Sequence, residues 1–139
     1  MLRSLLLILA AVLLMSPVFL SGQGSDHFDA FFSNFKVAVQ QKDTATLDKM
    51  MDSKFDFIRA TSVPHQTVFE GLDSDNGRQW INLKQAVRGT PELYKGNGPY
   101  ENSRVLRCTP IRMAFNCVIV FKLDSQNHWR WKAMVMPTW

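Results

Sequence analysis

The stretch RVLRCTPIRMAFNCVIVF, residues 104–121, holds the two cysteines of the chain, Cys108 and Cys117. The residues around them are rich in valine, isoleucine and phenylalanine, which is typical of β-strands. A disulfide here would join two strands covalently, whereas free thiols would leave them held by backbone pairing alone. The compartment decides between these alternatives, because disulfides persist in exported proteins and are rare in the cytosol.

The N-terminal residues predict export. Arg3 precedes an unbroken apolar run, residues 5–15, which Ser16 and Pro17 end, and small residues follow shortly afterwards. This order is typical of a secretory signal peptide. The run is shorter than the ~20 residues of a membrane-spanning helix. Three more apolar residues follow Pro17, so an uncleaved membrane anchor stays as the alternative.

We therefore predict a signal peptide over residues 1–22 and a secreted or periplasmic mature chain over residues 23–139. The mature chain has 117 residues, enough for one domain with its own core. Its remaining apolar runs are too short to cross a membrane.

The charge of the mature chain is uneven along the sequence. Residues 23–77 carry five Lys/Arg against nine Asp/Glu, and residues 78–139 carry ten against three. The basic residues are spread singly, without a Lys/Arg run, so acidic helices that complement a basic sheet explain the asymmetry better than an anionic partner does. We expect no nucleic-acid binding, and membrane contact only if the leader stays uncleaved.

The cysteine spacing fits a structural disulfide. If the two stretches are antiparallel neighbours, Leu106 and Cys108 share one face of the first strand, and Cys117 and Ile119 share one face of the second. Free thiols are the alternative. A metal or redox site lacks a Cys-x-x-Cys pair, and His128 has no partner at ligand spacing. We expect no metal and no cofactor.

Apolar spacing predicts three helices before the main sheet. Residues 25–43 repeat phenylalanines at three- and four-residue steps, residues 43–51 form a short second helix, and residues 78–89 form a third. A short strand is predicted over residues 54–63. The segment PHQTVFEGLDSDNG, residues 64–77, is predicted to be irregular, and its DSDNG does not match a calcium-binding loop.

Three strands are predicted to close the chain after a loop rich in glycine and proline, residues 90–102. The last strand, HWRWKAMVM, alternates most clearly. It is predicted to place Trp129, Trp131, Ala133 and Val135 on one face. The predicted fold is α+β, with three N-terminal helices packed on one face of a curved antiparallel sheet.

This order, with the stretch FDAFFSNFKVAVQQKDTATLDKMM and the closing WRWKAM, resembles the nuclear transport factor 2-like superfamily. The resemblance implies a cone-like, cystatin-like fold and a pocket between the concave sheet face and the helices. Some members of the superfamily are isomerases or hydratases with an Asp or Asp–His pair, and others only bind ligands or partners. None of their catalytic residues maps onto a position of this sequence.

The residues predicted to line such a pocket are aromatic or cationic, and they are Trp80, Tyr94, Tyr100, Arg104, Trp129 and Trp131. Core packing is the alternative for the tryptophans, and an end-of-strand ion pair is the alternative for Arg104. Among the titratable residues, Asp56 is predicted to point away from the phenylalanine face. His65 and His128 are predicted to be solvent-exposed loop residues.

Three functions remain open. The first is non-catalytic binding of a small apolar ligand or an envelope protein in the cone pocket. The second is an isomerase or hydratase reaction in that pocket. The third is protein interaction through the exposed sheet face. The sequence lacks a Gly-x-Ser-x-Gly elbow, a phosphate loop and a dinucleotide fingerprint, which shifts weight away from an enzyme. A homodimer is compatible with each function.

Overall fold

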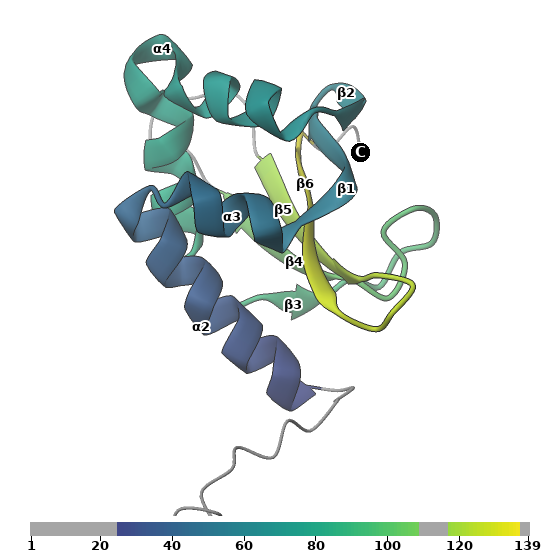
Figure 1. Ribbon diagram of the computed structural model, residues 1–139. Coiled ribbons are helices and arrows are strands. Elements are labelled where there is room, and N and C mark those ends of the chain that lie inside the picture. The colour runs from purple at the N-terminus through teal and green to yellow at the C-terminus, as the bar shows by residue number, and fades with distance from the viewer. Residues whose placement is uncertain (1–24, 109–116, 137–139) are drawn as a thin grey trace, which may run out of the picture.

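The computed structural model describes residues 25–108 and 117–136 (Figure 1). The predicted signal peptide lies outside these residues, as does the segment between the two cysteines. The elements follow one another as α2 Ser25–Gln41, α3 Thr44–Met50, β1 Met51–Ile58, β2 Ala60–Val63, α4 His65–Ala86, β3 Glu92–Leu93, β4 Arg104–Cys108, β5 Cys117–Leu123 and β6 Trp129–Val135. Within the described part, none of the helices has the length and apolarity to span a membrane.

The strands form one mixed sheet in the order β2-β1-β6-β5-β4-β3. β1 and β6 run parallel, and the other neighbouring pairs are antiparallel. The α+β class is confirmed, but the predicted all-antiparallel sheet is wrong. The last strand docks beside the first one, far away in sequence, and local alternation carries no information on that pairing.

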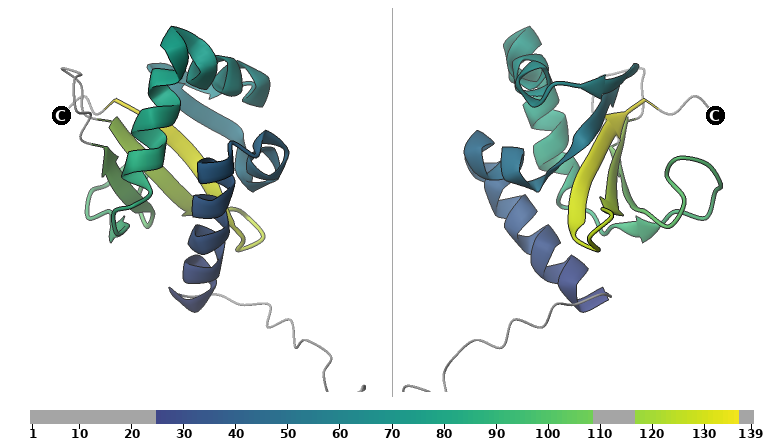
Figure 2. Two further views of the ribbon diagram at one scale, coloured as in Figure 1. Left: turned by 90° about the vertical axis from the view of Figure 1, so that its left-hand side faces the viewer. Right: turned by 45° about the vertical axis from the view of Figure 1, so that its right-hand side comes forward.

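The three helices cover one face of the sheet, as both views of Figure 2 show. α2 packs on the sheet through one side, on which its apolar residues recur. Phe28, Phe32, Phe35 and Val39 are buried, whereas the intervening Lys36 and Val37 are exposed. This spacing is the amphipathic pattern that makes a surface helix pack on a core.

α3 begins at an N-cap and leads directly into β1. Asp43 accepts hydrogen bonds from the Thr46 hydroxyl and backbone N–H, at 2.7 and 3.1 Å. These bonds lower the pKa of Asp43. An ionised cap satisfies a backbone donor that has no partner inside the helix. Leu47 then anchors α3 to the core with no exposed surface.

α4 corrects the prediction that residues 64–77 are irregular. The helix starts at His65, and Val68 and Leu72 are fully buried, four residues apart. The chain leaves helical geometry only at Ser74–Gly77, where Asp75, Asn76 and Gly77 have positive φ. The DSDNG stretch therefore marks a kink between two halves of α4. The first half was not predicted because polar residues stand among its apolar ones.

A β-bulge in β6 corrects the predicted alternation of the last strand. Phe121 pairs with Trp131, but Val120 pairs with Ala133, so Lys132 is an extra residue. Trp129, Trp131 and Met134 consequently pack on the helix side, whereas Ala133 and Val135 belong to a cluster on the other face. A period of two cannot anticipate this change of face.

The two cysteines form the predicted disulfide. Cys108 of β4 and Cys117 of β5 are directly paired in the antiparallel ladder, and their Cα atoms lie 4.9 Å apart. The predicted parity holds on the helix side, where Leu106, Cys108 and Ile119 are buried in the main core. The bond thus closes the hairpin whose connecting residues lie outside the described part.

Candidate functional site

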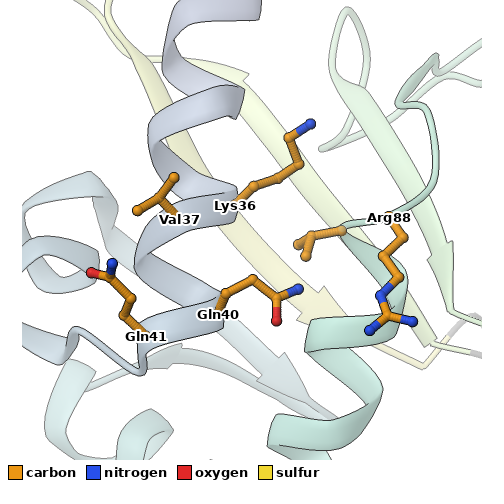
Figure 3. Close-up of a pocket in the computed structure, with 6 residues that line it drawn as sticks. Lys36, Val37, Gln40, Gln41 and Arg88 are labelled. Atoms are coloured by element: carbon orange, nitrogen blue, oxygen red, sulfur yellow. The ribbon is translucent and has the colours of Figure 1, made fainter.

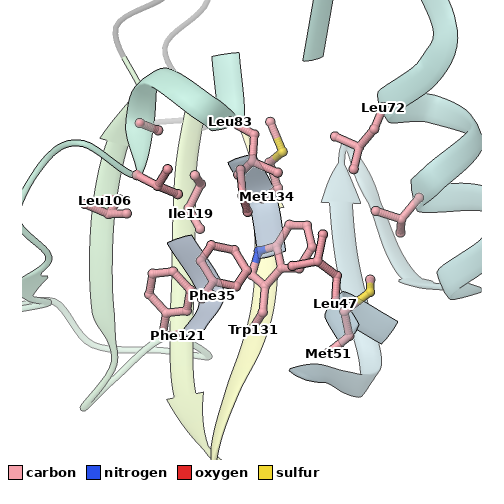
Figure 4. Close-up of a cluster of buried hydrophobic side chains, with 14 of the residues drawn as sticks. Phe35, Leu47, Met51, Leu72, Leu83, Leu106, Ile119, Phe121, Trp131 and Met134 are labelled. Carbon is pink, nitrogen blue, oxygen red and sulfur yellow. The ribbon is translucent and has the colours of Figure 1, made fainter. Parts of the chain in front are cut away.

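The space between α2 and the sheet, where a pocket was predicted, is filled by aromatic rings. The Phe35 ring lies edge-on to Phe121 at 5.0 Å and to Trp131 at 5.1 Å, and Phe55 contacts Trp131 at 4.8 Å, all between ring centroids. All four side chains are fully buried. Figure 4 shows Phe35 next to Phe121 and Trp131 in the middle of the cluster. The Trp131 indole N–H donates to the Ala133 carbonyl at 3.1 Å, so this ring is held in place.

Arg104 and Trp129 both contact Phe28, which lies in the first turn of α2. The guanidinium carbon of Arg104 is 5.6 Å from the centroid of the Phe28 ring, and the Trp129 ring lies edge-on to Phe28 at 4.8 Å. Arg104 is thus on the same face as Cys108, as predicted from strand parity. Within the described residues, the buried indole N–H of Trp129 finds no acceptor.

Trp80 lies apart from those residues, in the second half of α4. It is 1% exposed, and its indole N–H donates to Asp73 across the kink at 2.7 Å. The Lys42 ammonium lies 5.7 Å from the Trp80 ring centroid. Trp80 therefore links the kink to the residue that follows α2. Its contacts with Asp73 and Lys42 are separate from those of Arg104 and Trp129 with Phe28.

Tyr94 and Tyr100 lie on the opposite face of the sheet. They pack against Val105, Val118, Val120 and Ala133, and a loop closed by the Tyr94 N–H and the Ser103 carbonyl carries both. We call residues 94–103 the Tyr94–Ser103 loop. The structure therefore separates the six predicted pocket residues into three places.

Asp56 fixes the Tyr94–Ser103 loop to the sheet. Its carboxylate accepts from the Tyr100 hydroxyl at 3.1 Å and from the Ser62 N–H at 3.1 Å. The Lys122 ammonium also donates to the Pro99 carbonyl at 2.9 Å. Burial, the charge of Asp56 and the hydrogen bond to it raise the pKa of Tyr100 to about 12. Asp56 points away from the phenylalanine face, as predicted.

The prediction of a solvent-exposed loop histidine is confirmed for His128 and wrong for His65. His128 is exposed in the turn before β6. His65 is not a loop residue, because it begins α4 and is half-buried. Its Nδ1 lies 2.8 Å from the Asp48 carboxylate and its Nε2 2.7 Å from the Asp52 carbonyl. Each ring nitrogen therefore lies within hydrogen-bond distance of an oxygen. His65 thereby joins α3, β1 and α4.

A groove that the sequence did not predict lies between α2 and the end of α4 (Figure 3). Its volume is about 530 Å³, and it is open to solvent. Figure 3 shows Lys36 and Gln40 extending from α2 toward the segment that carries Arg88. The lining residues are Lys36, Val37, Gln40, Gln41, Val87 and Arg88.

The groove combines cations, amides and aliphatic surface. Gln40 donates from Nε2 to the Lys84 carbonyl at 3.1 Å, which joins the two helices and fixes the amide. Val37 is 55% exposed, so the groove presents apolar surface to solvent. Lys36, Val37 and Gln40 lie on the outer, exposed side of α2. Their closeness to Arg88 depends on how α4 docks, which no local pattern reports.

The described residues contain no group of three or more His, Cys, Asp or Glu side chains that could hold a metal ion. Comparison of the chain with family models, curated proteins and solved structures gives no match in any of the three.

Proposed function

We propose that the chain is an exported, disulfide-containing module that binds another protein on its surface. The observation that carries the proposal is the filled interior, where Phe35, Phe121 and Trp131 are fully buried against one another. A ligand between α2 and the sheet would have to displace such rings. Loss of the packing of one buried aromatic side chain costs roughly 3–5 kcal/mol, so internal binding of a small apolar molecule has less support.

A reaction inside the cone has less support for a related reason. General acid–base chemistry needs a titratable group that can reach a bound substrate. Asp56 lies on the opposite sheet face under Tyr100, and His65 lies at the corner of α3 and β1 with both ring nitrogens engaged. Both groups have structural partners, which favours a binding module over an isomerase or hydratase.

The groove between α2 and α4 is the surface we assign to the partner. The alternative surface, the sheet face that the helices leave uncovered, is partly covered because Tyr94 and Tyr100 pack over its valines. The groove instead presents the exposed Val37 between polar side chains.

Export and family are part of the same proposal. The disulfide between Cys108 and Cys117 supports an oxidising compartment, in agreement with the apolar leader. Helices on one face of a six-stranded sheet support membership of the nuclear transport factor 2-like superfamily, with the signal peptide preceding a single domain.

Site-specific photocrosslinking tests the surface assignment. A photoreactive phenylalanine analogue replaces Val37 in the groove or, as a matched control, Leu93 on β3, since both side chains are 55% exposed. The full chain is expressed in its native host with its own leader. We expect a discrete protein adduct from position 37 and none from position 93.

Two other results would contradict the proposal. Adducts from position 93 but none from position 37 would move the interface away from the groove. A small apolar compound that raises Tm and quenches Trp131 fluorescence would place the function inside the cone. A thermal-shift screen of such compounds against the purified, disulfide-bonded chain is the second measurement.

A further inference from the structure

We propose that the groove between α2 and α4 recognises an acidic segment of the partner with an aliphatic side chain among its carboxylates. This inference rests on the proposed function, because it specifies the partner of the same groove. Lys36 and Arg88 supply the positive charge of the groove, and none of its described lining residues is a carboxylate.

The two cations are available to a partner. Within the described part of the chain, neither Lys36 nor Arg88 forms an ion pair. The Lys36 ammonium lies 5.2 Å from the Phe32 ring centroid, a contact that orients the side chain without neutralising it. Arg88 is exposed directly after α4. Carboxylates are the complementary groups, and an arginine can bind one through two hydrogen bonds.

The aliphatic lining distinguishes a peptide from a simple polyanion. Val37 and Val87 lie in the same groove as the cations, and Val87 is 1% exposed whereas Val37 is 55% exposed. An aliphatic side chain of the partner would cover Val37 and remove its apolar surface from water. A polyphosphate would bring charge but no apolar group to cover this residue.

The side-chain amides of Gln40 and Gln41 can form hydrogen bonds with a peptide backbone. Gln40 commits its Nε2 to the Lys84 carbonyl, which aims its Oε1 away from that bond. An amide oxygen accepts a backbone N–H, and the neighbouring Gln41 amide can both donate and accept. Cations for carboxylates, amides for the main chain and valine for an aliphatic side chain together match an acidic peptide.

Peptide selection with charge exchange tests the inference. A random peptide library displayed on phage is selected against the disulfide-bonded chain, and the enriched peptides are measured by fluorescence anisotropy. We expect enrichment of acidic peptides that contain valine, leucine or isoleucine. The double variant K36E/R88E should weaken their binding at least tenfold. The matched control Lys95→Glu alters an exposed lysine away from the groove and should leave the affinity unchanged.

Charge exchange then provides a rescue that a folding defect cannot imitate. Replacement of the peptide glutamates by lysine should abolish binding to the original chain and restore it to K36E/R88E. Far-ultraviolet circular dichroism confirms that the variants fold. Val37→Ser should weaken binding with little change in its dependence on salt.

Three outcomes would overturn the inference. They are enrichment of neutral or basic peptides, acidic peptides that bind K36E/R88E as well as the original chain, and no enrichment at all. Selected peptides that bind outside the groove would contradict the acidic segment as the partner of the groove, but they would still agree with a protein that binds partners on its surface. An apolar ligand in the interior would instead remove the proposed function itself, so the two failures are distinguishable.

Discussion

Cys108 and Cys117 face each other across the β4–β5 ladder, and their disulfide lies at the end of the hairpin next to the connecting segment. Backbone pairing continues along the same strands from Cys108–Cys117 to Arg104–Phe121. The bond therefore fixes the register of the strands whose helix-covered face carries Leu106, Ile119 and Phe121. A slip of one residue would move these side chains to the opposite face.

Reduction of this disulfide should lower stability without abolishing the fold. The cysteines are nine residues apart. A closed loop this short stabilises the native state by roughly 2–3 kcal/mol, through restriction of the unfolded chain. We expect this loss in urea unfolding of the Cys108→Ser/Cys117→Ser variant, with an unchanged circular dichroism spectrum. The reduced original chain should match the variant, and equal stability of the oxidised and reduced chains would contradict the prediction.

Asp124 should make the β5–β6 turn sensitive to acid. Partial burial acts to raise its pKa, but hydrogen bonds from the His128 N–H, the Arg130 guanidinium and the Gln126 N–H outweigh burial and lower the pKa. A carboxyl group with a lowered pKa in the folded state contributes stability above its unfolded pKa, ~3.9. That contribution is lost as the pH falls through the lower, folded value.

The Asp124→Asn variant should therefore lose stability at neutral pH and show a flatter pH profile below pH ~4. Removal of these charge-assisted bonds costs about 1–3 kcal/mol. Urea unfolding at a series of pH values measures both effects. Asp29→Asn, on the exposed side of α2, is the matched control. Parallel profiles for Asp124→Asn and the original chain would show that the turn does not depend on ionised Asp124.

Tyr100 should titrate far above an ordinary phenol. Its pKa is raised to about 12 by burial, by the charge of Asp56 and by their hydrogen bond. Since the folded value exceeds the unfolded value of ~10, the stabilisation is complete below pH ~10 and is lost as the pH rises through the folded pKa. Ultraviolet absorbance at alkaline pH should show this late titration in the original chain but not in Tyr100→Phe. Asp56→Asn should shift it to lower pH, and an unshifted curve would exclude Asp56 as a cause.

Local signals were sufficient for some elements. The phenylalanine spacing identified the helix that buries Phe28, Phe32 and Phe35, because one amphipathic helix reports its own buried face. Strand parity likewise paired Cys108 with Cys117. In each case, the deciding interaction joins residues that are close in sequence.

Elements that depend on distant partners were missed. One missed element has a local cause. The spacing of Val68 and Leu72 fits a helix, but the turn-like DSDNG that follows led to a prediction of irregular structure. DSDNG only kinks α4. The extra Lys132 and the parallel pairing of β1 with β6 depend on how strands far apart in the sequence meet in the sheet. The groove needs both α2 and the segment after α4, so its residues had no common signal in the sequence.

Gly71 provides a test in which helix propensity and packing oppose each other. Alanine is favoured over glycine within a helix by about 1 kcal/mol, so a view of α4 alone predicts that Gly71→Ala is stabilising. The added Cβ would, however, overlap the Phe57 ring. Phe57 is 7% exposed and belongs to the main core, so its ring has little room to move. Overpacking of a core costs roughly 1–3 kcal/mol, and we expect the clash to dominate.

A double-mutant cycle separates the two effects. Gly71→Ala should lower the free energy of unfolding by about 1 kcal/mol in the original background. In the Phe57→Leu background the smaller side chain removes the overlap, so the same substitution should be neutral or stabilising. The difference between backgrounds is the coupling energy of residues 57 and 71. Equal effects of Gly71→Ala in both backgrounds would mean that α4 does not approach β1 as closely as the contact of Gly71 with the Phe57 ring requires.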